Sequence, residues 1–373
     1  MLVVGEASGD LHGARLAHAL VERDPALEIF GVAGERLRGE GVRVLFDVAR
    51  LTGMGLTELA GSLTTLWTAY RLIGGALREE KPDLLILIDF PEFNLRLARI
   101  AKGLGIPVLY YIGPQIWAWR PRRVKQIARR VDRMAVVFPF EVSIYEREGV
   151  EVSFVGHPLL DAVCPTQSRE ATLKQHGLDL SKSTIALLPG SRRREVAYHL
   201  PVMLEAAERL CHGMDVQFIL ARASTVERDE IRRFLARSSI QVAIAEGNAY
   251  DVLNACDFVW AASGTATLET ALLLKPMVIM YRLAWLTYGL ARLLVRVDHI
   301  GMVNILAGEK VVPELIQEEV TAERIVRETT RIMHESSVYH DTVAKLAAVR
   351  QKLGAPGAAD RVAEIALEMM GKN

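Results

Sequence analysis

The 373-residue sequence has few cysteines and no excess of charge of either sign. Its three cysteines are scattered and form no C-x-x-C pair, which argues against a disulfide framework and against a zinc site. The 45 Lys and Arg balance the 45 Asp and Glu, so no overall positive field indicates nucleic acid as a partner. The few, scattered cysteines are typical of a protein that works in a reducing compartment.

Long apolar runs are also missing. No window approaches the roughly 18 uninterrupted apolar residues of a membrane span. The first residues lack the charged region, apolar region and cleavage site of a secretory signal. We therefore expect a cytoplasmic protein that does not cross a membrane, although it is free to lie against one.

Short apolar runs, in contrast, are abundant, and they alternate with helical patterns in two successive series. The runs are continuous rather than alternating, as expected for parallel strands covered on both faces. The expected strands lie at 2–4, 27–33, 84–88, 108–112, 133–138 and 152–155 in the first series, and at 185–188, 216–220, 242–245, 258–262 and 277–280 in the second.

Each series predicts one Rossmann-like unit, so we expect an α/β fold with two doubly wound domains facing across a cleft. The predicted domains are residues 1–165 and 166–345, with the boundary in the polar stretch that follows His157-Pro158. For the last helices, residues 346–373, packing onto the N-terminal domain and packing onto a partner subunit are both open. Ligands of such sheets bind at the carboxyl ends of the strands.

The first turn between an expected strand and helix is Gly5-Glu6-Ala7-Ser8-Gly9-Asp10. Gly5 and Gly9 permit close backbone approach, and the following helix offers free N–H groups to an anion. The pattern is not G-x-G-x-x-G, which disfavours a dinucleotide-binding dehydrogenase. An ordinary tight turn is the alternative interpretation.

Two loops of the second series combine glycine with serine or threonine at strand ends. In 189–192, Pro-Gly-Ser-Arg, the backbone can meet a phosphate and Arg192 can supply a bidentate cation. In 262–269 a Ser-Gly-Thr helix start can bind a diphosphate, and Glu269 is suited to ribose hydroxyls. Each loop alone is also typical of a helix cap, but two in one half favour a nucleotide diphosphate site. The residues expected there are Gly190, Ser191, Arg192, Ser263, Gly264, Thr265 and Glu269.

Asp89 follows the apolar run 84–88, so it is expected at a carboxyl end, where partial burial would raise the pKa of a general base. The alternative is that Asp89 caps the next helix, which Pro91 makes credible. After the next strand, residues 115–120 carry two tryptophans beside an arginine. These rings could stack on a sugar, lie at an interface or belong to the core.

An apolar stripe recurs at steps of three and four residues between 59 and 77, along one face of a helix. A second segment, 282–296, mixes aromatic and aliphatic residues with arginines, as interfacial helices do. Membrane contact and core packing are open for both. The stripe consists of Leu59, Leu63, Leu66, Tyr70, Ile73 and Leu77, and Trp67 widens it.

Seven segments, in order and over nearly the whole chain, together resemble the lipid-A-disaccharide synthase family. They are Gly-Glu-Ala-Ser-Gly-Asp at 5–10, Ile-Asp-Phe-Pro-Glu-Phe-Asn at 88–94, Gln-Ile-Trp-Ala-Trp-Arg at 115–120, Gly-His-Pro at 156–158, Leu-Pro-Gly-Ser-Arg at 188–192, Ser-Gly-Thr-Ala-Thr-Leu-Glu at 263–269 and Asn-Ile-Leu-Ala-Gly at 304–308.

The resemblance implies a GT-B glycosyltransferase fold, inversion at the anomeric carbon, and neither metal nor cofactor. It implies UDP-2,3-diacylglucosamine as donor and 2,3-diacylglucosamine 1-phosphate (lipid X) as acceptor. The products would be the β-1,6-linked disaccharide 1-phosphate and UDP. Because these lipids must be drawn from a bilayer, we expect peripheral association with the anionic inner face of the inner membrane. A homodimer is compatible with the family.

The resemblance also implies roles for individual residues. Asp89 would take the proton from the acceptor 6′-hydroxyl, with Glu6 and Asp10 as rival bases. Arg192 and the helix start at Gly264-Thr265 would stabilise the departing UDP in place of a metal. The nucleotide pocket would extend to Asn304. Residues expected on the acceptor and lipid side are Ser8, Gln115, Trp117, Leu63, Leu66, Trp67 and Ile73.

Two other functions stay open at this stage. A UDP-N-acetylglucosamine 2-epimerase would have the same fold but would need no lipid acceptor. A non-catalytic nucleotide-sugar-binding protein that docks on membranes would release no UDP.

Overall fold

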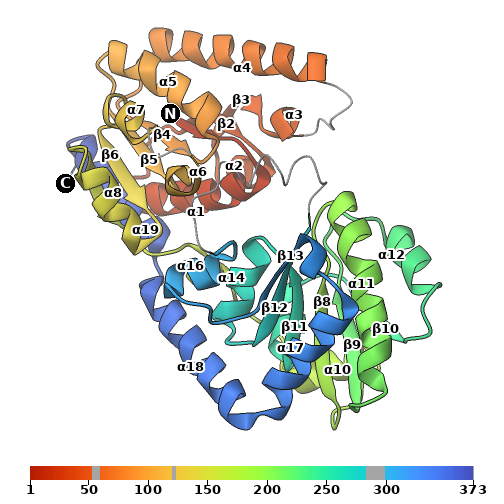
Figure 1. The fold of residues 1–373 in the computed structure, drawn as a ribbon. Coiled ribbons are helices and arrows are strands. Elements are labelled where there is room, and N and C mark those ends of the chain that lie inside the picture. Colours follow the sequence, from red (N-terminus) through yellow and green to blue (C-terminus); the bar gives the residue numbers. More distant parts are fainter. Residues whose placement is uncertain (53–58, 120–122, 283–298, 373) are drawn as a thin grey trace. The chain divides into compact units, whose positions relative to one another are not determined.

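The computed structural model describes residues 1–52, 59–119, 123–282 and 299–372, with the side chains at 7, 52, 59–63, 118 and 119 outside that description. The chain divides into two compact units, Met1–Asp161 with Leu353–Asn373 and Ala162–Lys352 (Figure 1). Each unit has one parallel sheet with helices packed on it. The predicted α/β class with two doubly wound units is therefore confirmed.

The sheet of the first unit has the strand order β3-β2-β1-β4-β5-β6-β7, and all its neighbouring strands are parallel. The two central strands β4 and β5 are completely buried, as their continuous apolar sequences require. Edge strand β3 was not predicted, because its charged ends break the apolar run. The strands are β1 (Leu2–Val4), β2 (Phe30–Ala33), β3 (Arg43–Asp47), β4 (Leu85–Ile88), β5 (Val108–Tyr111), β6 (Arg133–Val136) and β7 (Glu151–Phe154).

Right-handed crossovers place α1 and α2 on one face of this sheet and α4 and α5 on the other, as Figure 1 shows. Helix α19, from the end of the chain, packs against α1. The helices of this unit are α1 (Ala7–Arg23), α2 (Glu35–Gly39), α3 (Ala49–Thr52), α4 (Leu59–Glu80), α5 (Pro91–Gly103), α6 (Ile116–Trp119), α7 (Val124–Ala128), η2 (Pro139–Glu141), α8 (Val142–Glu146), α9 (Leu159–Ala162) and α19 (Ala358–Met369).

The sheet of the second unit has the order β10-β9-β8-β11-β12-β13 and is also parallel throughout. Its core is built around Trp260, whose indole N–H donates to the Thr329 hydroxyl at 2.8 Å. The short edge strand β13 was not predicted. The strands are β8 (Ser183–Leu188), β9 (Val216–Ala221), β10 (Val242–Ala245), β11 (Phe258–Ala262), β12 (Met277–Tyr281) and β13 (Glu314–Ile316).

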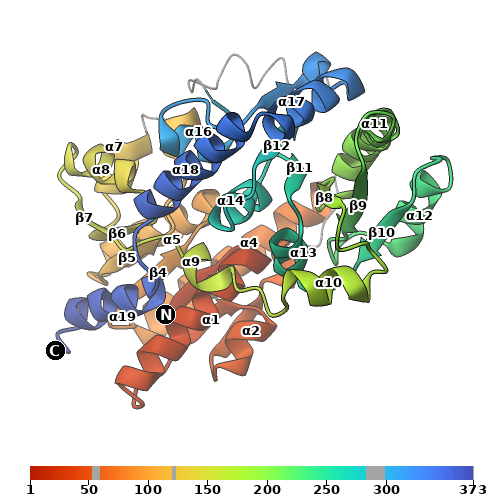
Figure 2. The same cartoon turned by 90° about the horizontal axis from the view of Figure 1, so that it is seen from below.

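Helix α11 packs against α12 and α17, whereas α14 packs against α16 and α18. Figure 2 shows α18 running alongside α14 and α16. No helix in the described part of the chain combines the length and apolar character that crossing a membrane requires. The helices are α10 (Arg169–Gln175), α11 (Arg193–Cys211), α12 (Arg228–Leu235), α13 (Ala249–Ala255), α14 (Thr265–Leu272), α16 (Met302–Ala307), η3 (Gln317–Glu319), α17 (Ala322–His334) and α18 (Ser336–Lys352).

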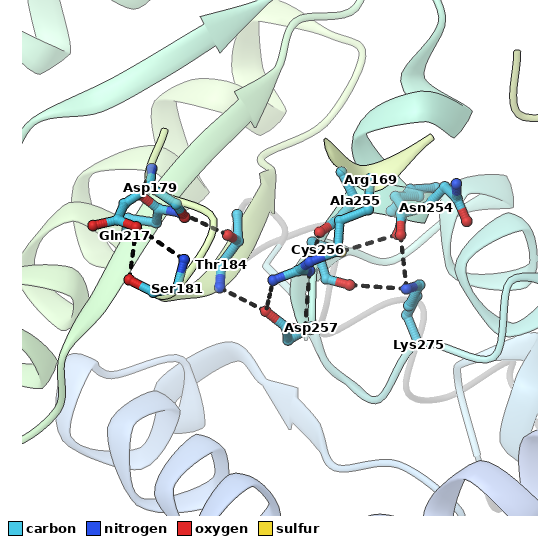
Figure 3. Close-up of polar contacts among 11 residues, drawn as sticks. Arg169, Asp179, Ser181, Thr184, Gln217, Asn254, Ala255, Cys256, Asp257 and Lys275 are labelled. Atoms are coloured by element: carbon cyan, nitrogen blue, oxygen red, sulfur yellow. Dashed lines mark hydrogen bonds and ion pairs between the residues drawn. The ribbon is translucent and has the colours of Figure 1, made fainter. Parts of the chain in front are cut away.

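A polar network closes the amino ends of β8 and β11 (Figure 3). The Asp257 carboxylate accepts from the Arg169 guanidinium through two bonds of 3.0 Å and from the backbone N–H of Thr184 at 2.8 Å. The Lys275 ammonium donates to the carbonyls of Asn254 and Cys256, each at 2.9 Å. The network stabilises the second unit by joining the amino ends of its strands. Ligands of parallel sheets bind at the opposite, carboxyl edge, which these residues do not occupy.

Candidate functional site

Asp89 lies directly after β4, in an unusual turn. Asp89 and Phe90 have φ values of 50° and 47°, the left-handed region that non-glycine residues rarely adopt. Two hydrogen bonds to the backbone carbonyl of Asp89 hold the turn in place: its oxygen accepts from the Asn94 side-chain amide at 2.7 Å and from the Tyr110 hydroxyl at 2.6 Å. Such held strain is typical of functional sites.

The Asp89 carboxyl group has the electrostatics of a general base. Burial raises its pKa above the ordinary value, the nearby Glu6 carboxylate raises it further, and the Phe90 N–H partly opposes both. The N-cap of α5 is Phe90, not Asp89. The alternative interpretation, that Asp89 is the cap of this helix, is therefore wrong.

The two rival carboxylates of the first turn differ from each other. Asp10 is buried, and its oxygens accept from the backbone N–H groups of Gly34 at 2.7 Å, Arg36 at 3.1 Å and Leu37 at 3.4 Å. The Asp10 carboxylate is thus committed to the start of α2, which disfavours it as a base. Glu6 is exposed, and Ser8 is exposed in the first turn of α1.

Gly5 joins this turn to the Asp89 turn. A Cβ on Gly5 would lie 2.1 Å from the Cβ of Phe90, so only glycine allows the two loops to approach this closely. The two motifs, more than eighty residues apart in sequence, therefore form one edge of the first unit. This close approach also explains why Glu6 influences the pKa of Asp89.

The loop after β5 brings Trp117 to a carboxylate that the sequence analysis missed. The Trp117 indole N–H donates to Glu141 at 3.3 Å, and its ring packs edge-on against Phe140 at 5.0 Å between centroids. Glu141 is only 1% exposed, and this burial raises its pKa to about 7. Trp117 is half-buried, whereas Gln115 is exposed in the same loop. Nothing near Glu141 in the sequence marks it as a partner of Trp117.

Helix α4 divides the predicted lipid-side stripe. Ile73 is completely buried in the core, so its placement on the lipid side was wrong; its helix, α4, packs against α5 and β3. Leu66 is half-buried, and the side chain of Leu63 lies outside the described residues. Trp67, in contrast, is 60% exposed, with the Arg71 guanidinium 4.7 Å from its ring centroid. The second amphipathic segment, 282–296, lies outside the described residues apart from Arg282.

In the second unit, the loop after β8 is organised by Glu195. Its carboxylate accepts from the backbone N–H of Ser191 at 3.0 Å and of Arg192 at 3.3 Å. Gly190 has φ 124°, and a Cβ there would lie 2.4 Å from the Cβ of Glu195. The N–H groups expected to meet a phosphate are therefore occupied by Glu195, while the Arg192 side chain is 81% exposed.

The loop after β11 begins α14 with Gly264 as the N-cap. A glycine cap carries no side-chain oxygen, so none occupies the N–H groups of the first turn, where a diphosphate would be stabilised. Gly264 and Thr265 are exposed, and Ser263 is half-buried. One turn further, Glu269 accepts a hydrogen bond of 3.0 Å from the Tyr250 hydroxyl. Burial raises the pKa of Glu269 above its ordinary value, and the hydrogen bond from Tyr250 opposes only part of this rise.

The side chain of Asn304 forms hydrogen bonds within the second unit. Its amide nitrogen donates to the Val312 carbonyl at 2.9 Å and to Glu314 at 2.7 Å, while its oxygen accepts from the N–H groups of Val311 and Val312 at 2.8 and 3.0 Å. These four bonds use the full capacity of a primary amide. Asn304 is also completely buried. The Asn304 side chain therefore shapes the loop between α16 and β13, and the predicted extension of the nucleotide pocket to Asn304 stays a prediction.

The family match and the most similar curated sequences agree on one family. The sequence model of the lipid-A-disaccharide synthetase family matches residues 1–365 of this chain. Lipid-A-disaccharide synthase of Geobacter metallireducens is 50% identical over 373 residues, covering 100% of this chain and 97% of that protein.

Solved structures with low sequence identity share the fold. The UDP co-structure of S. aureus MnaA has a TM-score of 0.69 at 13% identity, covering 100% of this chain and 97% of that one. MurG of Acinetobacter baumannii has a TM-score of 0.60 at 13% identity, covering 99% of each chain. At this identity the likenesses establish the fold alone, and it is the expected GT-B fold. The full-length family match goes further: this chain belongs to the lipid-A-disaccharide synthase family.

Proposed function

We propose that the protein transfers 2,3-diacylglucosamine from UDP to the 6′-hydroxyl of 2,3-diacylglucosamine 1-phosphate, giving the β-1,6-linked disaccharide 1-phosphate and UDP. The observation that carries this proposal is half identity, over the whole chain, with a protein named for the reaction. The epimerase alternative rests on the fold alone, because the solved structures named as UDP-N-acetylglucosamine 2-epimerases are only 14–15% identical to this chain.

Asp89 is the proposed general base. Its raised pKa makes it a stronger proton acceptor than an ordinary aspartate, while the rigid turn at the end of β4 holds it at the carboxyl edge of the first sheet. As the acceptor hydroxyl attacks the anomeric carbon, its proton passes to Asp89 and the bond to the UDP oxygen breaks. Glu6 is the remaining rival, because Asp10 is committed to α2.

The second unit is the proposed donor side. The negative charge that develops on the departing diphosphate would be stabilised by the Arg192 guanidinium and the uncapped start of α14. The Arg192 side chain is 81% exposed and pairs with Glu195 at 3.7 Å, and we expect it to leave this exposed pair and turn toward a phosphate. Glu195 would keep the Ser191 and Arg192 N–H groups oriented until the nucleotide arrives.

Measuring UDP release with both lipid substrates together, and with each of them alone, distinguishes the three candidate functions. With UDP-diacylglucosamine and lipid X together we expect UDP and disaccharide in equal amounts, and with either lipid alone neither product. Conversion of UDP-N-acetylglucosamine to its 2-epimer without an acceptor would favour the epimerase. Nucleotide binding without any UDP release would favour a non-catalytic protein. Either of these results would overturn the proposal.

Peripheral contact with the anionic inner face of the inner membrane is part of the proposal, and it places the protein in the cytoplasm. The outward face of α4 supports this contact, since it presents Trp67 and Leu72, 60% and 47% exposed, next to Arg71. Tryptophan and arginine are typical of helices that lie in a membrane interface, because the ring enters the headgroup region while the cation meets anionic lipid.

A further inference from the structure

Glu269 has a specific hydrogen-bond donor in the second unit. Among the described residues, its carboxylate accepts a hydrogen bond from the Tyr250 hydroxyl, at 3.0 Å to Oε1. The bond engages one carboxylate oxygen and leaves Oε2 able to accept from a ligand. Tyr250 lies in a part of the sequence that no nucleotide-binding motif includes.

The start of α13 holds Tyr250 in place. The Asn248 side chain caps this helix by accepting from the Tyr250 backbone N–H at 3.1 Å. The next residue, Asp251, is buried and accepts from the N–H and hydroxyl of Thr166 at 2.5 and 2.8 Å, and from the N–H of Gln167 at 2.9 Å. The phenol therefore projects from an anchored helix end rather than from a free loop.

Both helices begin at the same edge of the sheet. Helix α13 follows β10 and α14 follows β11, so each starts beyond the carboxyl end of a parallel strand. The hydrogen bond between Tyr250 and Glu269 thus joins two loops of the ligand-binding edge. The network at the amino edge, around Asp257, serves the stability of the unit in a different place (Figure 3).

A phenol differs from a cation as an orienting partner. It fixes the carboxylate through one hydrogen bond but does not neutralise its charge, so the carboxylate keeps its strength as an acceptor. A pair of adjacent hydroxyls on a sugar ring is a natural ligand for such a carboxylate. Those hydroxyls would reach it beside the uncapped start of α14, where a diphosphate would be stabilised.

We propose that Tyr250 is a positioning residue, which holds the Glu269 carboxylate in the orientation that accepts hydrogen bonds from the ribose hydroxyls of the nucleotide donor. The inference rests on the proposed function, which assigns this edge to a UDP-sugar. It adds that discrimination for the ribose depends on a residue that does not itself touch the nucleotide.

Calorimetric binding of UDP and of 2′,3′-dideoxy-UDP tests the proposal. We expect Tyr250→Phe to weaken UDP binding by about 2- to 10-fold, the range for one net hydrogen bond, and to leave dideoxy-UDP binding unchanged. Glu269→Gln should weaken UDP more. The double variant should be no weaker than Glu269→Gln alone, because Tyr250 acts through Glu269. In turnover, Tyr250→Phe should raise the donor KM and leave kcat within about 2-fold.

Two controls separate positioning from stability. Tyr250→Phe keeps the ring, so its unfolding midpoint should match wild type. Tyr198→Phe removes a half-exposed hydroxyl from α11 of the same unit and should change neither affinity. If Tyr250→Phe does not fold, the wild-type comparison of the two nucleotides decides, because the proposal requires dideoxy-UDP to bind more weakly than UDP.

Three results would overturn the proposal. Equal losses of UDP and dideoxy-UDP affinity in Tyr250→Phe would mean that Tyr250 only supports the fold. Unchanged UDP affinity would mean that Glu269 does not need it. Equal wild-type affinity for both nucleotides would remove the ribose contact, while the two-lipid release of UDP could still hold. Failure of that release, with the ribose discrimination intact, would instead overturn the proposed function alone.

Discussion

Asp89 and Asp10 are carboxylates of similar chemistry that the fold treats in opposite ways. Asp10 accepts from three backbone N–H groups at the start of α2. Asp89 lies in a left-handed turn, partly desolvated and close to Glu6, so its pKa is raised. At the scale of single residues, this difference in surroundings is the reason for proposing Asp89 rather than Asp10 as the base.

Asp89→Asn should lower kcat by about 10²- to 10⁴-fold, the loss typical of a removed general base, while donor affinity barely changes. In the wild type, activity should fall as pH drops through the raised pKa of Asp89, because the base is then protonated. A steady-state pH profile with a matched UDP titration measures both effects. Near-wild-type turnover of Asp89→Asn would transfer the role to Glu6.

Arg192→Ala should weaken UDP binding and slow transfer together, by about 10-fold or more, since a charge-assisted contact contributes about 1.5–3 kcal/mol. Arg192→Lys should restore only part of the loss, because the planar fork is absent. Arg193→Ala is the matched control, since Arg193 is similarly exposed (78%) and pairs with Glu230 at 3.0 Å, whereas Arg192 pairs with Glu195 at 3.7 Å. Normal UDP affinity in Arg192→Ala would remove this residue from the donor site.

Glu141 should make the stability of the first unit depend on pH. Burial raises its pKa from 4.5 to about 7, so its contribution to stability is present below pH 4.5 and is lost as pH rises through about 7. Compared with Glu141→Gln, the wild type should lose up to about 3 kcal/mol of unfolding free energy between pH 4.5 and 8. Urea unfolding of both proteins across this range measures the difference. Parallel pH profiles for the two proteins would contradict a buried neutral carboxyl.

At the scale of elements, α4 combines a buried stripe with exposed apolar side chains. The stripe residues Ile73 and Leu77 are core, whereas Trp67, which widens the stripe, and Leu72, which lies outside it, face solvent. The helical period predicts a common face but not whether that face is turned inward along its whole length. The solvent-facing residues are therefore the ones to test for membrane contact.

Trp67→Glu together with Leu72→Glu should leave the unfolding midpoint unchanged but reduce sedimentation with phosphatidylglycerol vesicles. It should also raise the apparent KM for the lipid substrates, because fewer molecules reside at the membrane. Leu104→Glu is the control, as it charges a leucine of similar exposure (40%) at the end of α5. Ile73→Glu should unfold the first unit, because it buries a charge. Unchanged vesicle binding of the double variant would exclude this face of α4 as the membrane-contact surface.

At the scale of the whole molecule, the end of the chain completes the first unit. Helix α19 packs on α1, where Arg23 pairs with Asp360 at 2.9 Å. The Arg361 guanidinium donates to the Val155 carbonyl at 2.9 Å, and the Asp161 carboxylate accepts from the Gly357 N–H at 2.8 Å. Residues 353–373 therefore belong to the same compact unit as residues 1–161.

Val362→Glu should destabilise the first unit by several kcal/mol, because Val362 is completely buried in α19. UDP affinity, assigned to the second unit, should stay within about 2-fold. Glu364→Gln is the control on the same helix, where the side chain is 66% exposed. Scanning calorimetry with and without UDP separates the two units. One unchanged transition in Val362→Glu would mean that α19 adds little to the first unit.

The fold class and most strands were predictable, since continuous apolar runs such as 84–88 and 258–262 leave no other structure that buries them. The edge strands β3 and β13 were missed, because half-exposed strands carry no such run. Of the predicted site residues, Asp89 lies directly after a strand and Glu269 lies one turn inside a helix, as their motifs predict. Their roles remain predictions.

The sequence by itself determined which residues stand at the carboxyl ends of strands, because that depends on neighbours along the chain. Only the tertiary structure decided which of them have their polar groups occupied. The partners of Asp10, Trp117 and Glu269 lie 24, 24 and 19 residues away. The side-chain amide of Asn304 forms its hydrogen bonds with the backbone of Val311 and Val312, which lie outside the motif that contains Asn304. Hydrogen bonds of this kind form between segments that packing brings together, so no local pattern contains them.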